Sequence, residues 1–267
     1  GTFYGIGLHF FSYKSCYFDD NMSGEGGVIH LNNNNKMVVL YSVFHSNIAF
    51  LQKGGSISTK TSEIILKLCI FKENVAKSKG GAAFLICQIQ HCQVQIKKVI
   101  FINNFANSGG LSLYISLAET IYINLTQFIS HKGEDTRSLL SIFLPSHILS
   151  DISIIRCNFI KNAQKNNSPA IFIAGEVNRI AHGKQQEGCF SSLKRENDNI
   201  ITIHGTLVHI HKVKFGITYH SGHVIEISSN SHPILEYVSF HCPLFNYVKQ
   251  ITRGKDNHEC SNLRQCY

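Results

Sequence analysis

Apolar residues alternate with polar ones in short segments of the chain, and these segments recur about every 27 residues. Each segment places apolar side chains seven and five positions before a phenylalanine, as Ile64 and Leu66 precede Phe71. Alternation with a period of two is typical of a strand with one buried face. The paired positions are Phe11/Tyr13, Met37/Val39, Ile64/Leu66, Val94/Ile96, Ile121/Ile123, Ile152/Ile154, Val208/Ile210 and Pro233/Leu235.

The phenylalanine that ends each segment often opens a second motif, Phe-x-x-Asn, which is followed by a double glycine. The stretch from Phe71 to Asn74 precedes Gly80 and Gly81 in this way. Successive phenylalanines lie 25 to 31 residues apart, except for one interval of 56, which is twice 28 and hides one unit. The phenylalanines are Phe18, Phe44, Phe71, Phe101, Phe128, Phe159, Phe215 and Phe240, and the motif asparagines are Asn21, Asn47, Asn74, Asn104 and Asn162.

A repeat of this length indicates a solenoid, a propeller or an array. Helical repeats would need a period of 3.6, and a four-stranded propeller blade needs roughly 40–45 residues. Hairpins of a β-sandwich are the remaining alternative, but they do not explain the constant phase. The sequence therefore predicts an all-β fold, a single-stranded right-handed parallel β-helix of about nine coils of about 27 residues.

Stacking of coils at about 4.8 Å places equivalent residues on top of one another. The phenylalanines are expected to form an interior aromatic column, and the double glycines to supply positive φ at a corner. The asparagines are expected at a turn, where this side chain bonds to backbone and tolerates left-handed geometry. Replacing Asn74 by Leu should then cost about 1–3 kcal/mol, because buried backbone groups lose their partners.

Residues 1–245 are assigned to the β-helix. The first residues resemble the strand that follows a double glycine, so the chain is expected to begin in mid-coil, as a segment of a longer protein. A degenerate coil or long loop is expected at about 176–199, and residues 246–267 form a polar cap or tail. No run of 18 apolar residues is present, so no transmembrane segment is expected.

The segment at about 176–199, where the repeat has lost its phenylalanine motif, is the candidate binding loop. Insertions in solenoids loop out on one face, which is often the binding face. Its cationic side chains would form a positive rim, with Phe190 as an apolar contact. The alternative is a decayed coil that forms a solvated surface. The candidate residues are Arg179, Lys184, Phe190, Lys194 and Arg195.

The formal net charge is +8 and the isoelectric point is near 9.0. The lysines are scattered, and no basic helix or finger spacing is present, so a nucleic-acid partner is not expected. Two interpretations remain open: an ordinary soluble surface, or a weakly cationic face that meets anionic glycans or a cell surface. The predicted partner is accordingly a protein or glycan surface.

Seven of the nine cysteines fall into two groups, and Cys189 and Cys242 remain unassigned. Cys16, Cys69 and Cys157 each precede a phenylalanine by two positions, in different coils that lie too far apart for a disulfide, so free buried thiols are expected. The candidate disulfides are Cys87 with Cys92, which flank a turn, and Cys260 with Cys266 in the tail. These pairs weakly favour an oxidising compartment.

Other signals in the chain are weaker. No CxxC pair occurs, which argues against a zinc site, and neither a metal nor a cofactor is predicted. Three N-x-S/T sequons begin at Asn21, Asn124 and Asn166, and they would mark a glycoprotein if the chain enters a secretory compartment.

The combination Phe-x-x-Asn followed by Gly-Gly and a small or apolar residue resembles the repeat of chlamydial polymorphic outer membrane proteins. More broadly, it is similar to β-helix segments of large surface proteins. The resemblance covers residues 1–245, most closely up to about 115, and the double glycine is lost in the second half. It implies extracellular, adhesive or surface-display roles, so a structural scaffold or adhesive binding surface outside the cell is expected.

The alternative class is the pectate-lyase-like polysaccharide lyases and hydrolases, which share the predicted fold. Hydrolysis needs paired carboxylates, and elimination needs an acidic cluster that holds Ca²⁺. Aspartate occurs only at positions 19, 20, 135, 151, 198 and 256. The pair Asp19–Asp20 aligns with His45–Ser46 and Lys72–Glu73, which indicates an ordinary turn position, so catalysis is not expected.

Overall fold

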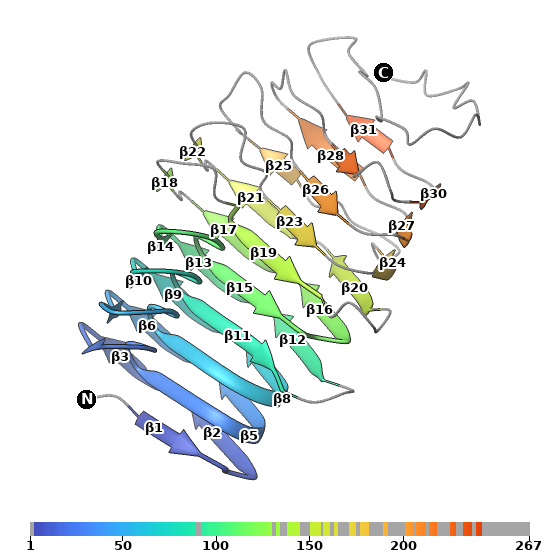
Figure 1. The fold of residues 1–267 in the computed structure, drawn as a ribbon. Helices are drawn as coiled ribbons and strands as arrows, with labels where there is room; N and C mark the ends of the chain where they lie inside the picture. Colours follow the sequence, from blue (N-terminus) through green and yellow to red (C-terminus); the bar gives the residue numbers. More distant parts are fainter. Residues whose placement is uncertain are drawn as a thin grey trace.

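A computed structural model of the chain shows a parallel β-helix, in which the coils stack from the N-terminal to the C-terminal end (Figure 1). The structure describes residues 3–88, 92–129, 132–133, 138–144, 150–155, 157–160, 163–164, 171–174, 177–181, 189–191, 201–204, 207–211, 214–217, 225–227, 232–236 and 239–241. These residues contain no helix, and every strand pairing is parallel. The predicted all-β solenoid is confirmed.

Three long faces surround the core. The first face comprises β1 (Phe3–Ile6), β11 (Ala83–Cys87), β15 (Leu113–Ser116), β19 (Leu140–Phe143), β23 (Ile171–Ala174), β26 (Ile201–His204) and β29 (Ile225–Ile227). The second face comprises β2 (Phe10–Lys14), β12 (Gln93–Lys97), β16 (Thr120–Asn124), β20 (Ser150–Ile155), β24 (Val177–Ala181), β27 (Leu207–His211) and β30 (His232–Glu236). The long strands β5 (Ile29–Leu40) and β8 (Ile57–Lys67) run through both faces and join them into one sheet.

The third face is a nine-stranded sheet with one strand from each coil, in agreement with the predicted nine coils. Its strands are β3 (Tyr17–Asp19), β6 (Val43–His45), β9 (Ile70–Lys72), β13 (Ile100–Ile102), β17 (Gln127–Ile129), β21 (Asn158–Ile160), β25 (Cys189–Ser191), β28 (Lys214–Ile217) and β31 (Ser239–His241). Short strands next to it form two small sheets, made of β4 (Met22–Ser23), β7 (Ile48–Ala49), β10 (Val75–Ala76) and β14 (Phe105–Ala106), and of β18 (Lys132–Gly133) and β22 (Ala163–Gln164).

The alternation read from the sequence sets which side chains enter the core. In β12, Val94 and Ile96 are fully buried, whereas Gln93 and Lys97 are exposed. Val94 lies in register with Ile64 of the coil before and Ile121 of the coil after. The apolar columns therefore fuse into one core that runs along the stack.

Phenylalanine side chains form a stacked column inside the third face. The rings of Phe44 and Phe71 lie 4.7 Å apart between centroids and are nearly parallel, and their neighbours continue at 5.0–5.3 Å. The strand register places in one row Phe18, Phe44, Phe71, Phe101, Phe128, Phe159 and Phe190. Stacked aromatic pairs add roughly 0.5–1.5 kcal/mol beyond their burial.

The row differs from the predicted one near its C-terminal end. Phe190 fills the hidden position, although it was expected in a binding loop, because β25 continues the third-face sheet. Phe215 pairs with Phe240, but the next residue in register with Phe190 is Ile217, so the row shifts by two residues there. A register shift of two residues leaves these side chains on the same face of the strand.

The motif asparagines form a buried hydrogen-bonded ladder, the asparagine ladder. Asn74 Oδ1 accepts from the backbone N–H and the side-chain amide of Asn47, each at 3.0 Å. The Asn74 amide donates to Asn104 Oδ1 at 2.9 Å and to the Phe44 carbonyl at 3.0 Å. Asn21 donates to Asn47 in the same manner, and Asn162 lies outside the described residues.

The turn beside this ladder is not made by the asparagine itself, contrary to the expectation that it would use its tolerance of left-handed geometry. The residue before it has positive φ, as in Asp20, Ser46, Glu73 and Asn103. This leaves the asparagine free to direct its amide along the stack. A second left-handed corner lies three residues before the phenylalanine of a coil. In the first five coils it is formed by Ser15, Tyr41, Leu68, Lys98 and Leu125.

The double glycines form another corner, where backbone approaches backbone. The first glycine has positive φ in the first three pairs, including Gly54. In the fourth pair the positive φ lies at Gly110, the second glycine, and Leu111 takes the place that Gly81 holds one coil earlier. The fourth pair is thus offset by one residue from the predicted alignment.

Candidate functional site

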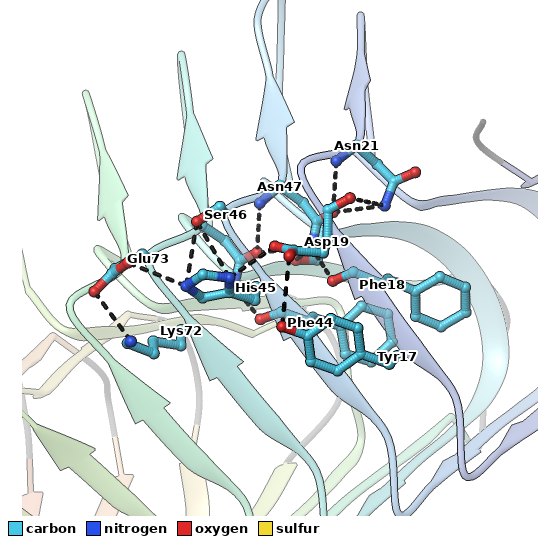
Figure 2. Close-up of polar contacts among 12 residues, drawn as sticks. Tyr17, Phe18, Asp19, Asn21, Phe44, His45, Ser46, Asn47, Lys72 and Glu73 are labelled. Carbon is cyan, nitrogen blue, oxygen red and sulfur yellow. Dashed lines mark hydrogen bonds and ion pairs between the residues drawn. The ribbon is translucent and has the colours of Figure 1, made fainter.

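A polar cluster on the outer surface of the third face joins three consecutive coils, and Figure 2 shows its side chains in a row across adjacent strands. Asp19, His45 and Lys72 each follow a phenylalanine of the interior row, so strand alternation turns them outward. Glu73 follows at the left-handed corner after β9. We refer to Asp19, His45 and Glu73 as the carboxylate–histidine cluster.

His45 lies between the two carboxylates. Its Nδ1 is 2.7 Å from Asp19 Oδ1, and its Nε2 is 3.2 Å from Glu73 Oε2. A neutral imidazole carries one N–H and cannot donate to both, whereas the imidazolium can. The arrangement is therefore complete only when His45 is protonated.

Other groups complete this cluster at its edges. Tyr17 OH donates to Asp19 at 3.5 Å, Ser46 Oγ lies 3.3 Å from the His45 ring, and Lys72 lies 3.5 Å from Glu73. The three members of the cluster are partly exposed, so each contact contributes little, about 0–1 kcal/mol. The cluster ties neighbouring coils together from outside, while the asparagine ladder does so from within.

The carboxylate–histidine cluster was missed in the sequence, where its residues were interpreted as ordinary turn positions. The signal that could have found it is opposite charge in equivalent positions of successive coils. Its imidazole occupies the space between the two carboxylates. Among the residues that the structure describes, no group of three or more His, Cys, Asp or Glu side chains is placed to hold a metal ion.

A row of cations follows the outer surface of the second face, beside its corner with the third. Lys67 and Lys97 lie in direct register, and Lys14 lies two coils before Lys67, with Leu40 between them. Lys98 occupies the adjacent left-handed corner and is exposed. We call Lys14, Lys67, Lys97 and Lys98 the lysine row.

Within the described residues, the lysine row has no acidic partner, which distinguishes it from Lys36 and Lys72. Lys36, on the same face, pairs with Glu63 at 2.8 Å. Within the described part of the chain, no acidic side chain forms an ion pair with any member of the row.

Two lysines in the corner segments before the first face have a packing role instead. Lys53 lies over the ring of Phe84, 4.6 Å from its centroid, and Lys79 lies 4.7 Å from that of Tyr114. These contacts help to leave Phe84 and Tyr114 only 4% and 6% exposed on the outer side of the sheet. The two aromatic rings are thus covered rather than displayed.

The predicted binding loop is in part regular structure. Arg179 lies in β24, in register with Asp151, and Phe190 lies in β25. The segment at 176–199 thus contains two strands of the solenoid, because its backbone keeps pairing where the sequence motif is lost. Lys184, Lys194 and Arg195 lie outside the described residues.

The cysteines divide between a disulfide and the column that precedes the phenylalanines. Cys87, at the end of β11, forms a disulfide with Cys92, just before β12, with Cα atoms 5.6 Å apart. Cys69 carries a free, buried thiol as predicted, and Cys157 is buried with its sulfur 3.7 Å from the Ile123 carbonyl. Cys16 is free but half-buried rather than buried as predicted, because it lies in the first described coil, which stacks against a neighbour on one side. Cys260 and Cys266 lie outside the described residues.

The buried thiol of Cys69 is expected to make the folded protein less stable at alkaline pH. Burial raises the pKa of its thiol from 9.0 to about 11, and contacts with the backbone at Ser42 and Lys67 lower the pKa by less. The folded state then retains a proton that the unfolded chain releases, so this contribution is full below pH 9 and declines as pH rises through 11. The whole effect is roughly 2–3 kcal/mol.

The test compares urea unfolding of the parent and Cys69→Ala at pH 8 and pH 10.5. The stability advantage of the parent should shrink by about 1–2 kcal/mol at the higher pH. Ser42→Ala changes the same column without a thiol, so its effect should stay constant with pH. An advantage of the parent over Cys69→Ala that is equal at both pH values would contradict the prediction.

The chain matches no family model, no curated protein and no solved structure. The described residues include no helix that could span a membrane.

Proposed function

We propose that this protein is a non-catalytic β-helix of the extracellular space or cell surface, which acts as a scaffold or adhesive binding surface. The observation that carries the proposal is the lysine row, which displays cations without acidic partners, within the described residues, on a continuous sheet face. Unpaired surface charge of one sign attracts partners of the opposite sign and speeds their association.

Two further observations support the proposed location and role. The Cys87–Cys92 disulfide fits an oxidising compartment. The Phe-x-x-Asn and double-glycine motifs, which resemble those of surface proteins, build the interior columns that hold the coils in register. A scaffold of this kind keeps its outer side chains at fixed spacing, which suits the binding of an extended partner.

A polysaccharide lyase or hydrolase is the second candidate, and the carboxylate–histidine cluster is the observation that favours it. Asp19 and Glu73 come from positions two coils apart, and inverting glycosidases separate their carboxyl groups by roughly 6.5–9.5 Å. His45, however, bonds to both carboxylates and fills the gap that a sugar and a water molecule would need. This contact supports the non-catalytic proposal.

One experiment separates the two functions. The folded protein is applied to a glycan array and to cultured cells, and in parallel is incubated with acidic polysaccharides while reducing ends and unsaturated products are measured. Saturable binding without new ends or unsaturated products supports the adhesive role. Turnover that disappears in His45→Gln or Asp19→Asn would establish the enzyme, and the absence of both binding and turnover would contradict the adhesive role.

A further inference from the structure

We infer that the lysine row binds a linear acidic glycan, a uronate or sulfated polysaccharide, laid along the solenoid axis on the second face. The inference rests on the proposed adhesive function and names the ligand class and its place. In the coils that carry the row, the other charged groups of this face are Lys36 and Glu63, which pair with each other. Asp151 and Arg179 lie in register with each other farther along the stack. Within its own coils, the row therefore carries the charge that is left for a ligand.

The spacing of the row points to a polyanion. Lys67 and Lys97 face outward from adjacent strands in direct register, about 4.8 Å apart at their backbones. Like charges placed directly opposite across two strands destabilise the pairing. Since no described acidic group relieves this repulsion, anions arranged along the axis would do so for several lysines at once.

The length of the row requires an extended ligand. From Lys14 to Lys97 it crosses three coil steps, which is about 14 Å at the strand spacing. A single sugar or a free phosphate would reach one or two of these lysines. A chain with a charge on each repeat would contact all of them, and its separate contacts would act together.

Side chains next to the row suit a ligand rich in hydroxyl groups. Gln95 projects from the same side of β12 as Lys97 and lies in register with Tyr122, while Asn124 is in register with Lys97. Asn124 Nδ2 donates to Tyr122 OH at 2.7 Å, which holds both groups at the surface. At the neighbouring corner Tyr41 is 54% exposed, so its ring is available to stack on a sugar.

These neighbours favour a glycan over the other polyanions. Amide and phenol groups donate to and accept from hydroxyls, which glycans carry on every ring. Duplex nucleic acid is bound mainly through its phosphates, and an anionic membrane through charge combined with buried apolar side chains. The polar groups between the lysines are not needed for either of those partners.

The test measures binding of fluorescent heparin fragments and oligogalacturonides to the whole chain by anisotropy. The variant Lys67→Gln/Lys97→Gln removes two charges from the row. The control Lys60→Gln/Lys77→Gln removes two charges from exposed lysines elsewhere. We expect about a tenfold loss of affinity for the first at low salt and less than about twofold for the second. Affinity should also rise with fragment length until the row is spanned.

Four results would overturn the inference. Equal losses in the two double variants would show that net charge alone governs binding. Equal affinity for anionic phosphatidylserine vesicles or duplex DNA, lost in the same variant, would identify a general anion surface. If Lys67→Gln/Lys97→Gln binds cells or neutral glycans as well as the parent does, the adhesive function would remain supported, but an acidic glycan would not be its ligand. A folded protein that binds no cell and no glycan would remove both.

Discussion

Gly54→Ala is expected to destabilise the β-helix by more than about 4 kcal/mol, so that little folded protein accumulates. A Cβ on Gly54 would lie 2.0 Å from the Ile57 carbonyl oxygen and 2.9 Å from the Ser58 backbone nitrogen. Both atoms belong to the main chain at the start of β8, which pairs on both sides. The corner therefore has no flexible side chain that could move aside.

Gly7→Ala is the matched control. Gly7 has a φ of 66°, almost the same as the 64° of Gly54, but a Cβ there would meet nothing within 4 Å. Only the left-handed backbone strain applies, which costs roughly 1–2 kcal/mol for an L-residue. Soluble yield and urea denaturation followed by far-UV circular dichroism would compare the two variants. Similar losses for both would show that the corner at Gly54 relaxes.

The strands and the interior columns could be predicted from sequence because each depends on a repeated local pattern. Alternation fixes which side of a strand is buried, and stacking converts a sequence period into a spatial column. Val94 between Ile64 and Ile121, and Phe71 between Phe44 and Phe101, follow from these two rules alone.

Where the period failed, the sequence left a degenerate coil and a long loop as open alternatives. The coil that contains Phe190 lacks the asparagine and the double glycine, and its strand on the second face pairs with a bulge between Ser150 and Asp151. Backbone hydrogen bonding does not need the motif, so the coil persists without it. The offset at Gly110 also arises in a turn. A shift by one residue there leaves two adjacent glycines in the sequence, but the positive φ falls on the second of them instead of the first.

The carboxylate–histidine cluster and the lysine row occupy fixed positions relative to the phenylalanines, so the sequence could have aligned their residues. Asp19 and His45 each follow a phenylalanine by one position, and Lys67 and Lys97 each precede one by four. The alignment does not show which surface side chains make contact, because this depends on the rotamers and corners of the folded chain. The free Cys16 and Cys69 followed from the same kind of fixed distance.

Asn74→Leu is expected to cost about 3 kcal/mol, the upper end of the range for unpaired buried groups. The substitution removes the acceptor for both N–H groups of Asn47 and the donor to Asn104 and to the Phe44 carbonyl. Asn47 and Asn104 are at most 1% exposed, so water does not reach the groups that lose their partner. Leucine has nearly the same shape as asparagine, and the loss will therefore report hydrogen bonding more than packing.

Asn21→Leu is the control, since it makes the same change at the end of the same ladder. Asn21 is partly exposed, and it donates to Asn47 Oδ1, which the backbone N–H of residue 21 would still contact. We expect a loss below about 1 kcal/mol there, because water can replace the amide. Urea midpoints for the two variants give the comparison directly. A ladder that stabilises the coils through its buried middle must show the larger loss at Asn74, and equal losses would mean that its hydrogen bonds contribute no more inside the stack than at its edge.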